Sequence, residues 1–309
     1  MTRAFVFPGQ GSQAVGMGKD LADAFPVARE VFEEVDDALG QKLSQLMWEG
    51  PEDDLRLTAN TQPALMAHSV AAMRVLEKEA GADVAAAAFV AGHSLGEYSA
   101  LCAARAISLS ETAKLLRIRG EAMQAAVPVG EGGMAAILGL DLEKVAEVIA
   151  GIDGAVEIAN DNCPGQVVIS GAAAAVEAAS AALKEAGAKR AVPLPVSAPF
   201  HSSLMQPAAE RMAEALKDAA VAAPAAPVMA NVTAAPTSDP AAIRDLLVKQ
   251  VTGRVRWTES VQAMLAAGVD QFVEVGTGKV LSGLIKKVER DAVVANVGTP
   301  ADIEAFSKL

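Results

Sequence analysis

The sequence is poor in the residues that support disulfide-rich, metal-bound or aromatic-rich architectures. Two of its 309 residues are cysteines, Cys102 and Cys163, which excludes a disulfide framework and a thiolate zinc site. Aromatic residues make up 4% of the chain and hydrophobic residues 52%, with alanine taking much of that share. We therefore expect a globular protein whose core consists of small side chains on closely packed backbone.

Positive charge is also scarce. Lysine and arginine total 26 against 38 aspartates and glutamates, so the formal net charge is −12. A chain with this balance lacks the basic excess that neutralises phosphates, and we expect no nucleic-acid partner.

Long apolar runs are missing as well. The first run, residues 4–7, ends at Pro8-Gly9 and is shorter than the roughly 7–15 apolar residues of a secretory signal. The apolar run at residues 84–91 falls far short of the ~20 residues that span a membrane. These absences favour a cytoplasmic setting with no membrane partner.

Strand-like and helix-like segments alternate along most of the chain. Residues 4–7 and 84–91 are apolar enough for buried strands, and residues 17–39 and 61–79 have helical periodicity. A further helix is expected from Ser108 to about residue 126. This alternation predicts an α/β fold with a parallel sheet.

Residues 128–197 follow a different order, βαββαβ, which is typical of a ferredoxin-like unit. Pro193 and Pro195 indicate that its last strand lies at a sheet edge, and residues 160–165 carry a dense turn signal. We expect a small subdomain, 128–197, inserted into a large α/β subdomain formed by 1–127 and 198–309. The expected strands are 134–140, 155–159, 166–170 and 190–195, and the expected helices are 142–150 and 172–186. Beyond the insert we expect helices at 207–220, 243–250 and 279–290 and strands at 228–231 and 272–275.

A candidate nucleophile lies in the segment Gly92-His93-Ser94-Leu95-Gly96, which fits the pattern G-x-S-x-G. An apolar strand precedes it and a helix-compatible run follows, and this is the context that a nucleophile elbow requires. The glycines permit a tight turn that lifts the hydroxyl to the end of the sheet, while the helix start favours developing negative charge. A chance match in which Ser94 is inert is the alternative.

A serine nucleophile needs a base, and the chain has three histidines, His68, His93 and His201. His93 adjoins Ser94, so its side chain is expected on another side of the elbow. His68 lies within a helical pattern and suits a buried, hydrogen-bonded core position. His201 follows a loop that leaves the small subdomain, and loops at sheet ends commonly carry catalytic groups. Elimination favours a Ser94–His201 pair.

With these residues identified, the chain closely resembles the malonyl-coenzyme A:acyl-carrier-protein transacylases of bacterial type II fatty acid synthesis. The matching segments run across nearly the whole sequence. They are Phe7-Pro8-Gly9-Gln10-Gly11-Ser12-Gln13, Thr61-Gln62-Pro63-Ala64, Gly92-His93-Ser94-Leu95-Gly96-Glu97, Arg119-Gly120-x-x-Met123-Gln124, Asn160-x-Asn162, Pro164-Gly165-Gln166, Ser197-Ala198-Pro199-Phe200-His201-Ser202, Gln250 with Trp257, and Glu274-Val275-Gly276-x-Gly278-Lys279.

The resemblance implies a hydrolase-like parallel-sheet core with a ferredoxin-like insert, and it implies roles for particular residues. Ser94 would carry the malonyl group as an ester, and His201 would act as base and then as acid. Gln250 would orient His201, and the backbone N–H groups of Gln10 and Leu95 would form the oxyanion hole.

The resemblance also implies which residues contact the substrate. Arg119 would bind the malonyl carboxylate. This fits the physical chemistry, because a buried carboxylate needs a partner and guanidinium pairs with it through two hydrogen bonds. Arg117, two residues away, would face elsewhere; without the resemblance the two arginines cannot be separated. Phe200 would narrow the pocket toward malonyl over methylmalonyl. The remaining expected contacts are His93, Met123, Asn160 and Asn162.

The implied partners are malonyl-coenzyme A and acyl carrier protein, with no metal and no resident cofactor, and the family is usually monomeric. The carrier of this family is acidic, as this chain is, so docking would require a local basic patch. Lys189-Arg190, and Lys286-Lys287 with Arg290, are candidates; ordinary solvated charges are the alternative at both.

Two other functional classes remain open. A serine esterase would need an acidic residue to orient His201 and would have no use for Arg119, whereas a non-catalytic carrier-binding module would leave Ser94 inert. Two nucleotide-binding motifs are rejected. Gly9-x-Gly11-x-x-Ala14 lacks an acidic residue ending a second strand, and Gly276–Lys279 lacks the first glycine and the Ser/Thr of a P-loop.

Overall fold

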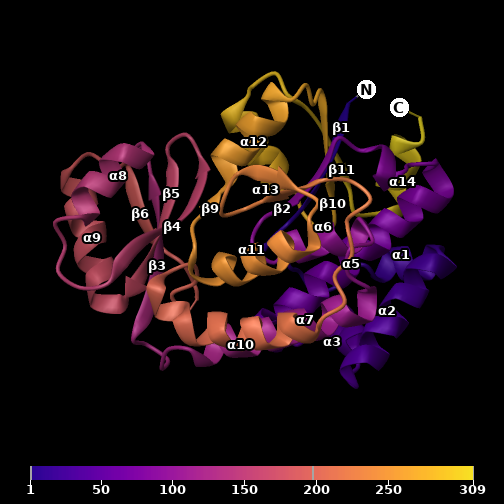
Figure 1. Ribbon diagram of the computed structural model, residues 1–309, viewed down its shortest axis with the longest axis horizontal. Helices are drawn as coiled ribbons and strands as arrows, with labels where there is room; N and C mark the ends of the chain where they lie inside the picture. Colours follow the sequence, from indigo (N-terminus) through magenta and orange to yellow (C-terminus); the bar gives the residue numbers. More distant parts are fainter. Residues whose placement is uncertain (1, 197, 309) are drawn as a thin grey trace.

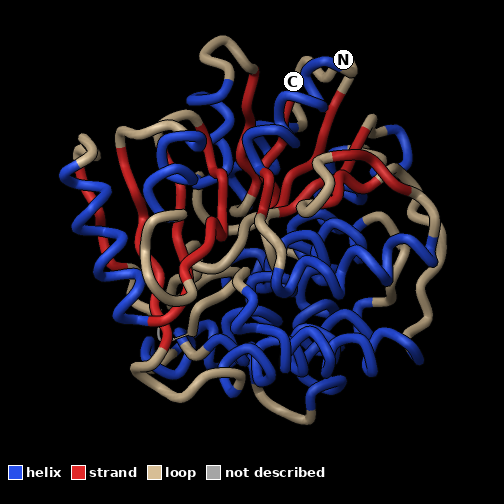
Figure 2. The backbone as a smooth tube through the Cα atoms, turned by 60° about the vertical axis from the view of Figure 1, so that its left-hand side comes forward, coloured by secondary structure: helices blue, strands red, loops and turns tan. Residues whose placement is uncertain are grey.

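The computed structural model describes residues 2–196 and 198–308. Two β-sheets lie side by side, each with its own helices, and the two chain ends lie on the same side of the molecule (Figures 1 and 2). Among the described residues, no helix combines the length and the apolar character needed to cross a lipid bilayer.

The larger sheet has the strand order β11-β10-β1-β2-β7-β8. Its strands run parallel, except that β8 is antiparallel to β7 at one edge. This confirms the parallel-sheet core, and it brings the carboxyl ends of β1 and β2 together. The bounds are β1 (Arg3–Phe7), β2 (Phe89–Gly92), β7 (Val228–Ala230), β8 (Ala235–Thr237), β10 (Gln271–Val275) and β11 (Val293–Val297).

Successive side chains of β1 point to opposite faces of the sheet, as in any strand, and pack into a different hydrophobic core on each face. Phe5 and Phe7 pack with helices α2 (Pro26–Leu39), α5 (Thr58–Ala80) and α7 (Leu109–Ala125) on one face. Ala4 and Val6 pack with α12 (Trp257–Ala266) and α13 (Val280–Val288) on the other. The sheet is therefore covered on both faces, which is why its strands read as continuous apolar runs.

The helices expected in the large region begin and end close to the expected positions, with one clear exception, whereas α3, α4, α12 and α14 were not expected. The periodic segment 17–39 is two helices and not one, because Phe25 is extended at φ −128°, ψ 118° ahead of Pro26, and Pro26 then begins the second helix. The other bounds are α1 (Lys19–Ala24), α3 (Leu43–Glu49), α4 (Glu52–Arg56), α6 (Gly96–Ala103), α10 (Gln206–Asp218), α11 (Pro240–Thr252) and α14 (Pro300–Phe306), with the 3₁₀ turns η1 (Val84–Ala86) and η2 (Ser203–Met205).

The strand expected at 84–91 is wrong in its first half. The side chain of Asp83 accepts a hydrogen bond from the N–H of Ala85 at 2.9 Å and caps a 3₁₀ turn, so that the strand begins only at Phe89. The alanines between them have little strand preference to oppose this local cap.

The smaller sheet confirms the ferredoxin-like βαββαβ unit. Its four antiparallel strands have the order β6-β3-β5-β4, and β6 lies at the edge, as the prolines predict. Helices α8 and α9 cover one face and bury Ile137, Val145 and Leu183 (Figure 1). The bounds are β3 (Gly132–Leu138), α8 (Leu142–Ile149), β4 (Val156–Cys163), β5 (Gln166–Ala172), α9 (Ala173–Glu185) and β6 (Arg190–Pro193).

The expected loop at 160–165 is largely strand. Strand β4 continues to Cys163, and only Pro164 and Gly165, with φ +75°, form the turn into β5. Backbone pairing explains the difference: Asn160 pairs with Val168 on one side and with Val255 on the other. Val255 belongs to β9 (Val255–Arg256), which follows α11 and extends the smaller sheet, so the two sheets are joined beside Asn160.

Candidate active site

Ser94 lies in a tight turn between β2 and α6, at the carboxyl end of the parallel sheet. Its φ is +54°, a left-handed conformation that non-glycine residues adopt rarely and mainly at functional positions. Gly92 and Gly96 make the turn possible. A Cβ on Gly92 would lie 1.9 Å from the Gly96 carbonyl, and a Cβ on Gly96 would lie 2.2 Å from the Phe7 oxygen. This is the geometry that the G-x-S-x-G pattern predicts.

His201 faces the serine. Its Nε2 lies 2.8 Å from Ser94 Oγ, and its Nδ1 lies 2.8 Å from the main-chain oxygen of Gln250 and 3.1 Å from that of Gly253. Carbonyl oxygens only accept, so Nδ1 carries the proton and Nε2 is left free to accept from the serine hydroxyl. His201 also has a positive φ, +56°. The structure therefore brings together the pair that elimination among the histidines favours.

The electrostatic surroundings keep this imidazole neutral. Burial, together with the nearby positive charge of Arg119, lowers the pKa of His201 to about 3. A histidine that is neutral at pH 7 and bonded to a serine hydroxyl is suited to act as a general base.

Arg119, on α7, also lies beside Ser94, and its side chain is 1% exposed. Its Nη1 donates to Gln62 Oε1 at 2.8 Å, while Nη2 donates to Gln250 Oε1 at 3.0 Å and to Ser94 Oγ at 3.2 Å. Its Nε is buried without a hydrogen-bond partner among the described residues, where no carboxylate is within ion-pair distance of it. A buried guanidinium with a spare donor beside a nucleophile is a site for an anionic group.

Arg117 has a different setting, as the sequence predicts. It is half-buried on another side of α7 and donates to Asn60 Oδ1 and Gln41 Oε1.

Gln250 contacts His201 through its main chain and not through its side chain. The side-chain amide instead lies below Ser94, where Nε2 donates to the Ser94 carbonyl at 3.0 Å and to Glu97 Oε2 at 2.8 Å. The position that holds an acid in hydrolase triads is thus filled by backbone carbonyls.

Three buried side chains that sequence reasoning did not single out complete the network: Gln62, Glu97 and Asn231. Asn231 Oδ1 accepts from the Ser94 N–H at 2.8 Å, and its Nδ2 donates to the Gly92 oxygen at 2.7 Å, so it ties both arms of the elbow. Its signal in the sequence is its place just beyond β7, the neighbour of β2, since adjacent parallel strands end at the same edge. Gln62 and Glu97 lie within the quoted motifs, but their partners are distant in sequence.

The remaining predicted substrate contacts lie on the elbow, on α7 and on β4. His93 turns away from Ser94, as expected: its Nε2 lies 2.8 Å from Asn162 Oδ1, and its ring lies 5.7 Å from that of Trp257. Asn160 is buried on the same strand as Asn162. Met123 is buried on α7, one turn from Arg119, and its sulfur accepts from Gln62 Nε2 at 3.7 Å.

The expected oxyanion donors flank the elbow. Leu95 is the N-cap residue of α6, and N–H groups at the start of a helix have no partner within it. Gln10 follows β1, and the loop is held against the elbow because a Cβ on Gly9 would lie 2.6 Å from the His93 oxygen. Gln10 and Phe200 both line an adjoining cavity of about 300 Å³. Ser197, which begins the Phe200-His201 motif, lies outside the described residues.

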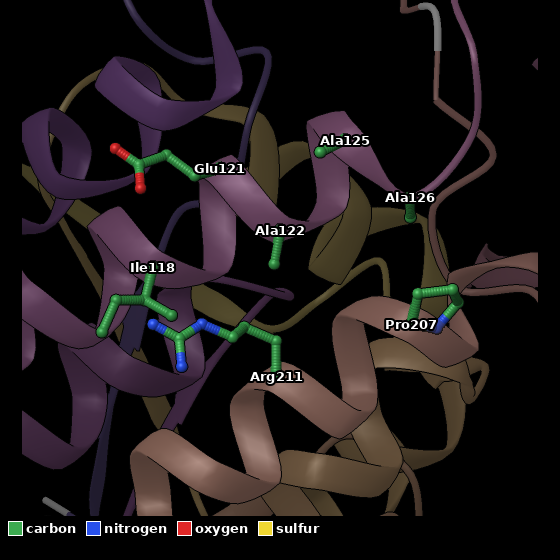
Figure 3. Close-up of a pocket in the computed structure, with 7 residues that line it drawn as sticks. All are labelled: Ile118, Glu121, Ala122, Ala125, Ala126, Pro207 and Arg211. Carbon is green, nitrogen blue, oxygen red and sulfur yellow. The ribbon is translucent and has the colours of Figure 1, made fainter.

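A second cavity, of about 370 Å³, lies between α7 and α10 (Figure 3). Its polar side chains are Glu121 and Arg211, and neither serine, cysteine nor histidine lines it. His68, the third histidine, is a buried core residue as predicted, and its Nε2 bonds to the Gly298 oxygen at 2.9 Å. The nucleophile, base and buried cation occur together only around Ser94 among the described residues.

Comparison with known proteins agrees with this geometry. The family model for the acyl transferase domain matches residues 4–299. A curated relative from Bacillus subtilis, a malonyl CoA-acyl carrier protein transacylase, is 49% identical and covers 97% of this chain and 95% of its own. The crystal structure of an acyl-carrier-protein S-malonyltransferase from Bartonella henselae is 57% identical, with a TM-score of 0.97 over 100% of this chain and 99% of that one.

A third match is a malonyl-transacylase solved in complex with a type II PKS acyl-carrier protein. It is 44% identical, with a TM-score of 0.96 over 100% of this chain and 99% of that one. The sequence identity, the coverage and the fold all agree: the chain belongs to the acyl transferase family, among the malonyl CoA-acyl carrier protein transacylases.

Proposed function

We propose that this chain moves a malonyl group from malonyl-coenzyme A to the phosphopantetheine thiol of an acyl carrier protein, for fatty acid synthesis. The observation that carries the proposal is the Ser94–His201 hydrogen bond with Arg119 Nη2 only 3.2 Å from the same serine oxygen. A nucleophile, a base and a buried cation in one place suit an acyl group that ends in a carboxylate. The names of the relatives agree.

In the first half-reaction, Ser94 Oγ attacks the thioester carbonyl while His201 Nε2 takes the hydroxyl proton. The N–H groups of Gln10 and Leu95 receive the negative charge that develops on the carbonyl oxygen. The C–S bond then breaks, and the coenzyme A sulfur leaves as a thiol with the proton from His201. Serine ester and free thiol are the products, and no other reactant is needed.

The second half-reaction reverses these roles. The carrier thiol gives its proton to His201 and attacks the malonyl-serine carbonyl, and Ser94 leaves as a hydroxyl. The main-chain oxygens of Gln250 and Gly253 hold the imidazole in the one tautomer that serves both directions.

Specificity for a dicarboxylic acyl group rests on Arg119, since an acetyl group has no carboxylate to pair with the buried guanidinium and its spare Nε donor. Phe200, at the adjoining cavity, limits the room beside the α-carbon and disfavours a methylmalonyl group. His93, Met123, Asn160 and Asn162 form the rest of the wall against which the substrate lies.

A serine esterase is the second candidate, and one observation counts against it. The Nδ1 of His201 contacts two main-chain carbonyls, where an esterase of this fold has a carboxylate. The buried arginine at the nucleophile has no role in hydrolysis of an uncharged ester.

We propose that residues 1–127 and 198–309 form the large subdomain and that residues 128–197 form the small one. We further propose that the phosphopantetheine arm of the carrier enters between the two subdomains. Every group of the proposed mechanism comes from one chain, so the reaction needs no second copy, and we propose a monomer. Both cysteines are free, in keeping with a reducing cytoplasm.

The acidic carrier requires basic residues near that entrance. Lys189 and Arg190 are exposed where the edge strand β6 begins. Lys287, on α13, reaches across to Gln166 Oε1 on the smaller sheet at 3.2 Å, so it and Lys286 lie where the two sheets meet. Charge reversal at each pair in turn, with the KM for carrier as readout, tests which of them docks it.

The test of the function itself follows the two half-reactions. Protein incubated with malonyl-coenzyme A and then desalted should carry one malonyl group by intact mass, and added carrier protein bearing its phosphopantetheine thiol should remove it and become malonylated. Release of free malonate in place of transfer would support the esterase, and absence of any adduct would contradict both.

A further inference from the structure

Glu97 is a buried carboxylate that the steps above leave unused. It lies in the first turn of α6, three residues after Ser94, and it is 2% exposed. Its Oε2 accepts from the N–H of Asn231 at 3.0 Å and from Gln250 Nε2 at 2.8 Å. Burying a carboxylate is costly, so one directly beneath a nucleophile calls for an explanation.

The first consequence concerns the direction of the Gln250 amide. Its Nε2 faces acceptors only, the Glu97 carboxylate and the Ser94 carbonyl, while its Oε1 faces the Arg119 donor at 3.0 Å. Turning the amide around would place oxygen against oxygen at one end and donor against donor at the other. Glu97 makes the shortest of the hydrogen bonds that fix the amide in this orientation, together with the Ser94 carbonyl and Asn231 Oδ1, and this orientation holds Arg119 beside Ser94.

The second consequence concerns charge. Arg119 is a buried cation, and Glu97 is the buried anion that reaches it through a single amide. A malonyl carboxylate paired with Arg119 would bring a second negative charge into the same enclosed space. Two anions and one cation away from water are less stable than a neutralised arrangement, so one carboxylate gains a proton.

We propose that Glu97 is a positioning residue that acts on Arg119 through Gln250, and that its carboxylate takes up a proton when a carboxylate-bearing acyl group occupies Arg119. The inference rests on the proposed function and deepens it, since it ties recognition of the acyl carboxylate to a proton. A protonated Glu97 still accepts at Oε2, so the Gln250 amide keeps its direction in both states.

The electrostatic surroundings of Glu97 support this proposal. Burial raises the pKa of Glu97 to about 7, while the hydrogen bonds from Asn231 and Gln250 and the charge of Arg119 each hold it lower. Cancelling the charge of Arg119 removes one of these lowering influences, so the pKa of Glu97 moves above 7 and its proton occupancy rises near pH 7.5. The other titratable groups nearby are Tyr98 on the same helix, His93 on the elbow and His201. Both imidazoles have pKa values lowered by burial and stay neutral at this pH.

The charged side chain that acts on the pKa of Glu97 is that of Arg119 on α7. Strands β2 and β7 contain no titratable side chain, and Arg3 of β1 bonds to Gln271 at the opposite end of its strand. Helix α5 brings His68, whose ring bonds to Gly298.

The test mixes the protein with malonyl-coenzyme A at pH 7.5 in weak buffer with an indicator dye, and the malonyl-serine in the same sample is measured by intact mass. Acyl transfer from thioester to hydroxyl releases a neutral thiol and takes up no proton itself. We expect a net uptake of up to about one proton per malonyl-serine in the wild type, and its loss in Glu97→Gln, which keeps an acceptor oxygen for Gln250. Glu121→Gln, the same change on the exposed side of α7, should retain the uptake.

Further variants separate the positioning role of Glu97 from its charge. Glu97→Ala removes the shortest of the hydrogen bonds from Gln250 Nε2 and leaves those to the Ser94 carbonyl and Asn231 Oδ1. The amide is then held less firmly, and kcat should fall about 10²-fold relative to Glu97→Gln. If Glu97→Gln does not fold, the pH dependence of KM in the wild type tests the proton uptake instead. Its KM for malonyl-coenzyme A should then rise above pH 7, by up to about tenfold per pH unit, whereas its KM for acetyl-coenzyme A should not.

Each remaining outcome contradicts a distinct claim. Malonyl-serine that forms with equal proton uptake in the wild type and Glu97→Gln, or a flat pH profile of KM, overturns the proton coupling. Equal kcat in Glu97→Ala and Glu97→Gln overturns the positioning role. Absence of malonyl-serine in the wild type overturns the proposed function and this inference with it.

Discussion

Two buried polar clusters lie at the carboxyl edge of the large sheet, and they contain much the same chemistry. The elbow cluster, beyond β2, consists of Ser94, Glu97, Arg119, Asn231, His201 and Gln250. The β10 cluster, beyond β10 and β11, consists of His68, Glu274, Ser282, Asn296 and Gly298. Each has a glutamate whose pKa burial raises and a buried histidine bonded to a main-chain carbonyl.

The clusters differ in whether they contain a charge without a counter-charge in contact and a hydroxyl placed for reaction. Glu274 accepts from the N–H groups of Leu281 and Ser282, at the start of α13, and from Asn296 Nδ2, so it binds a helix to two strands. The elbow cluster contains a buried cation that has no carboxylate in contact with it among the described residues, and a serine hydroxyl in a left-handed turn. Burial and residue type are thus shared, and the unmatched cation beside a nucleophile distinguishes a reactive site from a structural one.

The largest effect that would test this comparison is expected from two serines, Ser94 of the elbow cluster and the buried Ser69. Ser94→Ala should lower kcat for malonyl transfer on the order of 10⁶-fold, because it removes the attacking oxygen. Ser69→Ala removes a buried hydroxyl near Gly276 that has no hydrogen-bond partner in the described part of the chain, and it should leave transfer intact. Both are measured by transfer to the carrier thiol, and equal effects would contradict the comparison.

The next effect concerns the buried cation. Arg119→Ala should lower kcat/KM for malonyl-coenzyme A by about 10²–10³-fold, because the acyl carboxylate would be buried without its partner. Acetyl-coenzyme A should lose far less. Arg117→Ala, two residues away on α7, serves as the matched control, and steady-state kinetics with both substrates give the ratio. Equal losses for the two acyl groups would show that Arg119 does not read the carboxylate.

A smaller effect is expected from the asparagines of the two clusters. Asn231→Ala removes the bonds to the Ser94 N–H and the Gly92 oxygen, so the elbow loses its support and kcat should fall about tenfold. Asn296→Ala removes a donor to Glu274 and should lower the free energy of unfolding by about 1–3 kcal/mol with kcat unchanged. Kinetics and thermal unfolding of both variants separate the two roles; the reverse pattern would contradict them.

The smallest effect is expected from a change of pH, which should leave the contribution of His201 to Ser94 acylation unaltered. The pKa of His201 is lowered to about 3, so the imidazole stays neutral and able to accept a proton well below the ordinary histidine range. Acylation of Ser94 should therefore show no loss attributable to His201 between pH 7 and pH 5, measured by quenched single-turnover intact mass. A fall centred near pH 6.5 would indicate an exposed imidazole and an open site.

Much of this could be predicted from the sequence, because the signals are local. The elbow follows from two glycines around Ser94, and the βαββαβ unit follows from short periodic segments. The failures occurred where a tertiary or capping contact outweighs composition. The Asp83 cap shortens β2, and strand pairing on both sides holds Asn160 in a strand although asparagine favours turns.

The supporting shell of the site could not be predicted, for a related reason. Asn231 contacts residues 137 and 139 positions away, and Gln62 contacts Arg119 across 57 positions. Nothing local to these residues marks them as polar groups that a fold will bury together. Gln250 contacts His201, but through its main-chain oxygen, while its side-chain amide lies beneath Ser94, and no local signal distinguishes these two arrangements.

The most direct test of the account is the covalent state of Ser94 itself. After a short incubation with malonyl-coenzyme A and acid quench, peptide mapping should place a single malonyl group on Ser94 in the wild type. Intact mass should show no adduct in Ser94→Ala and a full adduct in Ser69→Ala. A malonyl group on any other residue, or an adduct that persists in Ser94→Ala, would contradict the assignment of the elbow cluster as the reactive site.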